Sequence, residues 1–135
     1  MEHLAIMSKG YIEKILSGEK SIESRFSVNR ISPFGKIKAG EKVYLKETGK
    51  PVSASFEVES VLFFNDLDKG KITEIRAKYG NQICAEEDFW QIKQRARYAT
   101  LIFVKNPKRV KPFKVEKSNR SAFMSVSSIK ELMIR

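Results

Sequence analysis

The 135-residue chain is poor in the two residues that most often hold metals, with one cysteine, Cys84, and one histidine, His3. A single cysteine excludes an internal disulfide and a CxxC motif, and structural zinc sites need several Cys or His ligands. We therefore expect no bound metal and assign no cofactor. Cys84 is interpreted as a small buried hydrophobe in a reducing compartment, and His3 as an ordinary polar residue.

Long apolar runs are also missing. No stretch approaches the roughly 20 apolar residues that cross a bilayer. Residues 1–7 lack the apolar centre of a secretory signal. These absences predict a soluble, cytoplasmic protein with no membrane partner. The length fits one domain, residues 1–135, which can bury its own core.

Acidic residues are outnumbered, with 16 Asp and Glu against 26 Lys and Arg, so that the net charge is +10. A charge of this size attracts phosphate backbones over long distances. We expect RNA or a nucleotide as partner, and DNA would be attracted by the same charge. The alternative is that the charge serves solubility alone. No pattern specifies an oligomeric state.

The most specific pattern that is present is G-x-K-x-x-E-x-R, formed by Gly18, Lys20, Glu23 and Arg25. It lies where a helical pattern gives way to a strand pattern. Side chains alternate along a strand, so Glu23 and Arg25 should project from one face, with Lys20 reaching the same pocket from the helix exit. The pattern predicts a charged ligand-binding cleft. A salt-bridge cluster that ties the helix to the sheet is the alternative.

Hydrophobic periodicity and turn residues predict short strands with a few short helices between them. Ser8 is expected to cap a helix that ends at Gly18, Gly80-Asn81 to end a second helix, and Ser128 to open the last one. Residues 28–41 read as a loop, in which Arg30, Lys36 and Lys38 are placed to rim the site. Strands are expected at 4–7, 42–47, 52–60, 98–104 and 121–126.

Individual side chains can also be assigned to the core or the surface. In strand 52–60 the odd-numbered residues Ser53, Ser55, Glu57 and Glu59 should face water, opposite an apolar face. Trp90 is assigned to the core.

The densest positive stretch runs from residue 105 to 120. It is typical either of a solvated edge strand or of a nucleic-acid contact. We assign nucleic-acid binding to Lys105, Lys108, Arg109, Lys111 and Lys114. Asn106-Pro107 is expected to end the preceding strand. Phe113 and Phe123, which flank the stretch, are candidates for base stacking.

The G-x-K-x-x-E-x-R motif, and the order of elements around it, resemble the ASCH domain, a small PUA-like β-barrel. The resemblance implies an α+β fold with short flanking helices, which agrees with the pattern of short strands. It also implies a cleft for RNA, a nucleotide or a modified base. There Arg25 would hold a phosphate or carbonyl, Glu23 would orient Arg25 or accept a base amine, and Lys20 would add a mobile charge.

The resemblance also implies an enzymatic alternative. One ASCH branch is an amidohydrolase that deacetylates N4-acetylcytidine with a Lys, a Thr and a Glu. Lys20 matches the lysine of that branch, whereas the position of its threonine is occupied by Glu23 here. If this chain is an enzyme, Lys20 and Glu23 are the catalytic candidates. Its glutamate falls in a region with three candidates, Glu74, Glu86 and Glu87. Ribonuclease action by Lys20 with the hydroxyl of Ser21 or Ser24 is a third reading.

Overall fold

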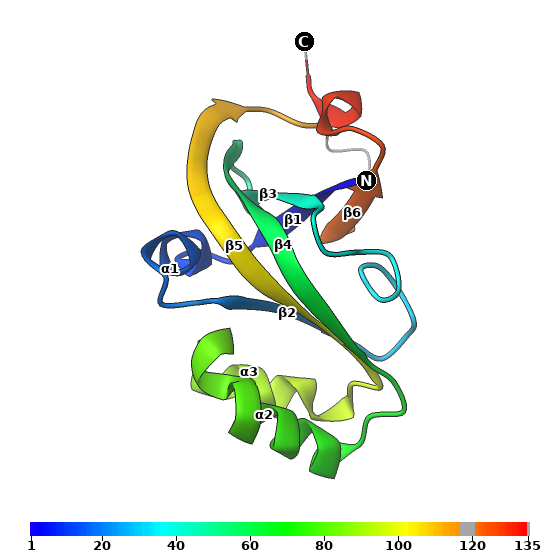
Figure 1. The fold of residues 1–135 in the computed structure, drawn as a ribbon. Coiled ribbons are helices and arrows are strands. Elements are labelled where there is room, and N and C mark those ends of the chain that lie inside the picture. Colours follow the sequence, from blue (N-terminus) through cyan, green and yellow to red (C-terminus); the bar gives the residue numbers. More distant parts are fainter. Residues whose placement is uncertain (117–120, 135) are drawn as a thin grey trace.

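A computed structural model of the protein describes residues 1–116 and 121–134. Six strands form one sheet that curls into a half-barrel (Figure 1), in the order β2-β5-β4-β3-β1-β6. The strands are β1 (Glu2–Met7), β2 (Ile22–Ser27), β3 (Lys42–Glu47), β4 (Val52–Phe64), β5 (Tyr98–Phe113) and β6 (Phe123–Val126). The helices are α1 (Tyr11–Ser17), α2 (Lys69–Ile83) and α3 (Glu87–Ile92), with 3-10 turns η1 (Lys93–Arg95) and η2 (Ile129–Leu132). The predicted α+β class is confirmed.

The sheet is open between its two edge strands. β1 pairs with β3 in parallel, and the other pairings among the described residues are antiparallel. The long strands β4 and β5 form the centre of the curl (Figure 1). β2 occupies one edge and β6, next to β1, the other, so the described strands form no closed barrel.

The helices pack against different parts of the sheet. Ile12 and Ile15 of α1 pack with Val43, Leu45 and other buried residues of the curled sheet. Helices α2 and α3 cover β2 and β5 through a second cluster that contains Trp90, which is 6% exposed. The assignment of Trp90 to the core is therefore confirmed. None of the described helices has both the length and the apolar character of a membrane span.

The prediction that β5 ends at Asn106-Pro107 is wrong, because the strand continues to Phe113. Asn106 takes a left-handed backbone conformation with φ 49°. Between the pairs Glu57 with Lys105 and Ser55 with Lys108, β5 holds one residue more than β4. Such a bulge accommodates a proline, which has no N–H to donate to the ladder.

Ser55 was expected to face water and is instead fully buried, with no partner for its hydroxyl among the described residues. It pairs across the sheet with Tyr44, which packs against a third cluster that contains Val115 and Ile129. The C-terminal segment thus covers this face of β4 at Ser55, whereas Glu57 and Glu59 are exposed as predicted.

Two helix ends also differ from expectation. Gly10, not Ser8, precedes α1, with φ 91° and no side-chain cap. Helix α2 runs past Gly80-Asn81 to Ile83, and Cys84 ends it in a left-handed conformation with φ 53°. Cys84 is half-buried at this position, so it is a helix cap and not the buried hydrophobe expected. The predicted cap at Ser128 is confirmed, with Glu131 completing a capping box.

His3 is a fully buried residue with a partner at each ring nitrogen, which contradicts its interpretation as an ordinary polar residue. Nδ1 lies 2.8 Å from Ser125 Oγ and Nε2 lies 2.9 Å from Glu41 Oε1. These contacts join β1 to β6 and to the loop before β3. The sequence alone does not predict these contacts, because Glu41 and Ser125 lie 38 and 122 residues from His3 along the chain.

Candidate functional site

The turn after α1 directs Lys20 into the interior. Gly18 ends the helix at φ 86°, a conformation that glycine adopts without steric cost. The backbone N–H of Lys20 then donates to the carbonyl of Lys14 at 2.9 Å. The Lys20 side chain is 3% exposed, and its ammonium donates to the backbone carbonyl of Ile83. Lys20 is therefore held in place, and the expectation of a mobile charge is wrong.

Glu23 lies between the two cations of the motif. Its Oε1 is 3.7 Å from Lys20 Nζ, and its Oε2 accepts a hydrogen bond of 2.9 Å from Arg25 Nη2. The carboxylate also accepts the N–H of Ser24 at 3.1 Å. The structure thus brings the three predicted residues together, with Glu23 orienting Arg25, and their charges sum to +1.

Arg25 reaches from β2 toward the opposite edge of the sheet. Its Nη2 donates to the carbonyl of Ile6 at 3.1 Å, and Nη1 lies 3.4 Å from the carbonyl of Ala122. The guanidinium carbon lies 5.5 Å from the ring centre of Phe123. Arg25 Nε has no partner among the described residues. Much of the fork is thus bonded to the protein, while the side chain is still 20% exposed.

Burial lowers the pKa of Lys20, since a buried ammonium loses its hydration, and the nearby Glu23 carboxylate offsets part of that effect. The Tyr11 ring, centred 5.1 Å from Lys20 Nζ, forms another side of this pocket. Lys20 therefore loses its proton at a lower pH than an exposed lysine would.

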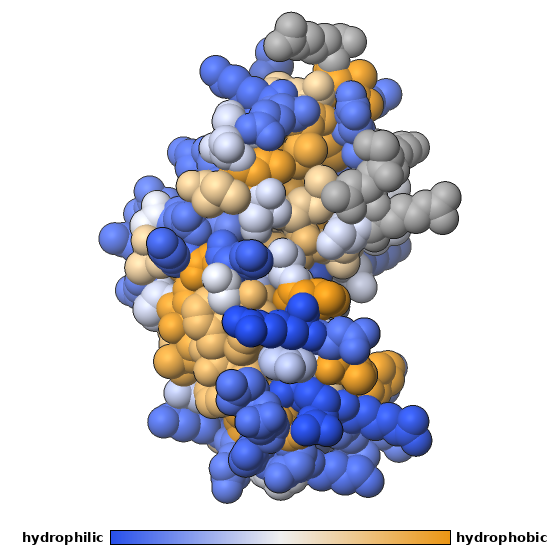
Figure 2. Space-filling model, turned by 90° about the vertical axis from the view of Figure 1, so that its right-hand side faces the viewer, coloured by the Kyte–Doolittle hydropathy of each residue, from blue (hydrophilic) through white to orange (hydrophobic). Residues whose placement is uncertain are grey.

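The three residues line a cleft of about 560 Å³, a volume within the usual range for small-molecule sites. The cleft lies at the opening between β2 and the edge formed by β1 and β6. Its other wall carries apolar and aromatic side chains from the 28–41 loop, β5 and α3: Ile31, Pro33, Phe34, Phe89 and Tyr98. Figure 2, which faces the right-hand side of Figure 1, shows hydrophobic residues gathered around the middle of this side of the molecule.

Sequence reasoning missed Thr100 and Lys93. Thr100 lies directly across the ladder from Arg25, is 1% exposed and lines the cleft. Lys93 lines its mouth, with its ammonium 5.6 Å from the ring centre of Phe89. Burial and, to a lesser extent, Arg25 lower the pKa of Lys93. Only the pairing register of β2 with β5 and the position of η1 after α3 reveal these two residues.

The three candidate glutamates of the middle region lie in different places. Glu86 lines the cleft and lies 3.6 Å from Lys14 Nζ. Glu87 binds Arg76 through both its oxygens, and Glu74 lies in a separate hollow beside α2. The enzymatic reading thus retains Glu86 alone.

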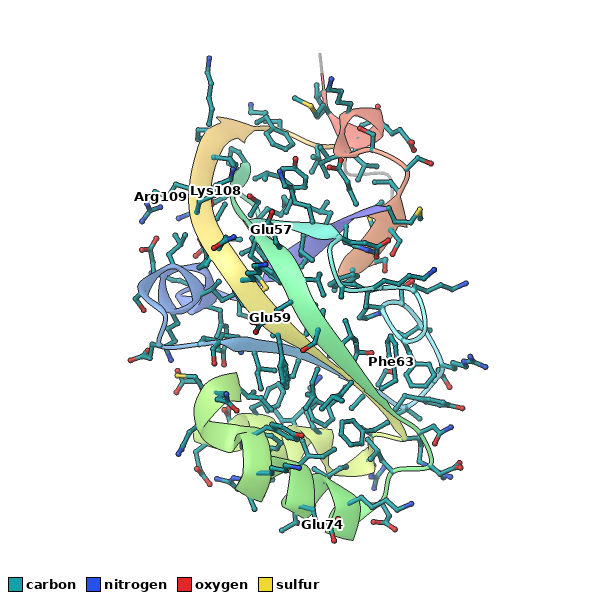
Figure 3. The ribbon with its side chains drawn as sticks, viewed as in Figure 1. Glu57, Glu59, Phe63, Glu74, Lys108 and Arg109 are labelled. Atoms are coloured by element: carbon teal, nitrogen blue, oxygen red, sulfur yellow. The ribbon has the colours of Figure 1, made fainter. Side chains whose placement is uncertain are left out.

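The predicted basic residues do not line the cleft. They project from the second half of β5 and just beyond it, and all five are exposed: Lys105, Lys108, Arg109, Lys111 and Lys114. Arg109 binds Glu13 through both carboxylate oxygens at 2.8 and 2.9 Å. Figure 3 shows Lys108 and Arg109 near Glu57, with Glu59 farther along β4.

Of the residues predicted to stack bases or to rim the site, some lie at the cleft and others do not. Phe123 is 3% exposed and lines the cleft, whereas Phe113 packs against Tyr44 in a T-shaped contact. Phe123 is thus buried in the wall of the cleft, whereas Phe113 is half-buried away from it. Arg30 lies over Phe34 beside the cleft, but Lys36 and Lys38 do not line it.

No family model and no curated protein matches the chain, but solved structures do. The ASCH protein from Zymomonas mobilis aligns with a TM-score of 0.73 at 14% identity, covering 99% of this chain and 96% of that one. A single-substitution variant of that protein aligns with a TM-score of 0.70 at 13% identity, covering 98% and 99%. The chain therefore has the fold of ASCH domain proteins, and the predicted PUA-like architecture is confirmed.

Proposed function

We propose that the protein binds RNA by taking up one nucleotide in the cleft above Lys20, Glu23 and Arg25. The observation that carries this proposal is a buried cluster with a net positive charge, facing an aromatic wall across about 560 Å³. A planar base suits such a wall, and carbonyl or phosphate oxygens suit the positive floor. The net charge of +10 favours a polyanion over a neutral metabolite.

Each floor residue has a distinct task in this proposal. Arg25 presents its exposed edge to an oxygen of the ligand, and Glu23 keeps the guanidinium plane fixed. Lys20 holds Glu23 from below and contributes charge without moving. Thr100 adds a hydroxyl group that can donate to or accept from a base edge.

The β5 lysines provide a second, sequence-independent contact. Lys105, Lys108, Lys111 and Lys114 form no ion pair with a described residue. They are free to neutralise phosphates outside the cleft. Counterion release would make this part of the affinity strongly salt-dependent.

The test is fluorescence anisotropy of labelled single-stranded RNA, titrated with wild type and Thr100→Val at two salt concentrations. Thr100→Val keeps the side-chain shape but removes the hydroxyl from the cleft. We expect wild-type binding that weakens with salt, and a variant several-fold weaker at both concentrations. Absence of binding by the folded wild type at low salt would refute the proposal.

Hydrolysis of an acylated nucleoside is the second candidate, because burial lowers the pKa of Lys20 and Thr100 and Glu86 line the same cleft. Incubation with N4-acetylcytidine, followed by chromatography, tests it. Turnover that disappears in Lys20→Met would establish the hydrolase. A binder would show no turnover in either protein.

A further inference from the structure

An aromatic cluster adjoins the cleft on its outer side. The ring centres of Phe34 and Phe63 are 5.4 Å apart, and those of Phe34 and Tyr98 are 5.1 Å apart. Phe34 and Tyr98 line the cleft, whereas Phe63 lies beyond its rim and is 42% exposed. Figure 3 shows Phe63 where β4 passes the 28–41 loop. We call these three residues the aromatic platform.

A cation accompanies the platform. The guanidinium carbon of Arg30 lies 5.3 Å from the ring centre of Phe34. Arg30 is exposed and forms no ion pair with a described carboxylate. An isolated exposed phenylalanine needs no explanation. Here the exposed Phe63 ring contacts Phe34, and Phe34 in turn carries the unpaired Arg30. Aromatic rings with an arginine beside them are what single-stranded nucleic acids use for stacking.

Positive charge continues on the far side of Phe63. This residue also lines a hollow of about 450 Å³ with Lys71 and Lys78 of α2. Lys71 Nζ donates to the carbonyl of Asp66, and neither lysine forms an ion pair within the described chain. Glu74 is the one carboxylate of this lining, so the two lysines leave it net positive.

We infer that the platform is a second base subsite, on which the nucleotide next to the one in the cleft stacks through Phe63. The backbone would then continue toward Lys71 and Lys78. The ligand class is single-stranded nucleic acid of at least two nucleotides, not a free nucleotide. This inference rests on the proposed function and adds a direction to it: the strand leaves the cleft past β4 toward α2.

The test compares two probes on one protein. Fluorescein-labelled random-sequence hexamers of RNA and of DNA are titrated by anisotropy, and the four ribonucleoside 5′-monophosphates are titrated separately by calorimetry. We expect an RNA or DNA hexamer to bind wild type at least about tenfold more tightly than any monophosphate, since each stacked base adds affinity.

Variants of Phe63 locate the gain. Phe63→Leu keeps an apolar side chain but removes the stacking face, so hexamer binding should weaken roughly five- to a hundredfold while monophosphate binding is unchanged. Phe63→Trp should retain hexamer affinity. Leu62→Ala, which alters a neighbouring exposed position on the other face of β4, is the matched control and should bind both probes as wild type does.

Four results would overturn the inference. Equal hexamer affinity in Phe63→Leu and wild type would show that the ring does not stack a base. Equal loss in Leu62→Ala and Phe63→Leu would show a nonspecific effect. Hexamers no tighter than monophosphates would remove the second subsite while leaving the cleft function intact, and binding of neither probe would refute both proposals.

Discussion

Arg25 on β2 donates a hydrogen bond of 3.1 Å to the backbone carbonyl of Ile6 on β1. β1 and β2 lie at different sides of the sheet order, so this contact spans the opening of the half-barrel. The same Nη2 atom binds Glu23 at 2.9 Å. The floor of the candidate cleft is therefore also the tie between the two edges of the sheet.

Replacement of Arg25 by lysine should weaken this tie. Lysine carries the charge but lacks the planar fork that reaches Glu23 and Ile6 together. We expect the free energy of unfolding to fall by about 1–3 kcal/mol, as measured by urea denaturation. Arg109→Lys is the control, because its exposed pair with Glu13 should contribute only about 0–1 kcal/mol. Equal losses in the two variants would contradict the role of Arg25.

Glu23→Gln should leave the buried Lys20 without its carboxylate partner. Breaking a buried pair from one side costs about 3 kcal/mol, because a desolvated charge remains. The double variant Lys20→Met, Glu23→Gln removes that charge and should be more stable than Glu23→Gln alone. Thermal and urea unfolding of the set measure this. A double variant as unstable as the sum of the two single losses would show that Lys20 and Glu23 act independently.

Acid should remove a contribution of Glu41 to stability. Burial by itself would raise the pKa of Glu41, but hydrogen bonds from His3 and from the Lys38 N–H lower it below the ordinary value of 4.5. A carboxylate with a lowered pKa stabilises the fold above pH 4.5, and this contribution is lost as pH falls through the folded-state pKa. The stability difference between wild type and Glu41→Gln should therefore narrow between about pH 5 and pH 3. A difference that is independent of pH in urea titrations would refute this account.

The β5 lysines should govern salt dependence. Substituting glutamine at positions 105, 108, 111 and 114 should reduce the slope of log affinity against log salt for single-stranded RNA by up to about 3. A charge-matched variant with glutamine at positions 36, 38, 46 and 50 is the control and should change the slope less. Equal slopes in the two variants would mean that β5 does not contact the phosphates.

The sequence predicted the fold class and the meeting of Lys20, Glu23 and Arg25, because these depend on local spacing. Gly18 ends the helix and alternation along β2 places Glu23 beside Arg25. It also suggested that Lys20 would be mobile. Lys20 is held by contacts with Ile83 and Tyr11, and no local sequence pattern predicts that these residues lie beside it.

The errors at Ser55 and His3 share one physical origin, which is coverage by distant segments. Ser55 is buried by the C-terminal cluster, and His3 meets Glu41 and Ser125 across the sheet. At Asn106-Pro107 a bulge absorbs the proline that would otherwise end the strand. Thr100 enters the cleft through the register of β2 with β5, and such pairing is fixed by tertiary structure.

The most direct test of the central claim is an NMR titration of isotope-labelled protein with a short single-stranded RNA, monitoring backbone amides. Binding in the cleft predicts the largest shifts at residues 23–26, 34–35 and 98–100. It predicts smaller shifts along residues 105–114. Shifts confined to residues 105–114, with the cleft amides unchanged, would contradict the claim that the Lys20, Glu23 and Arg25 cleft receives a nucleotide.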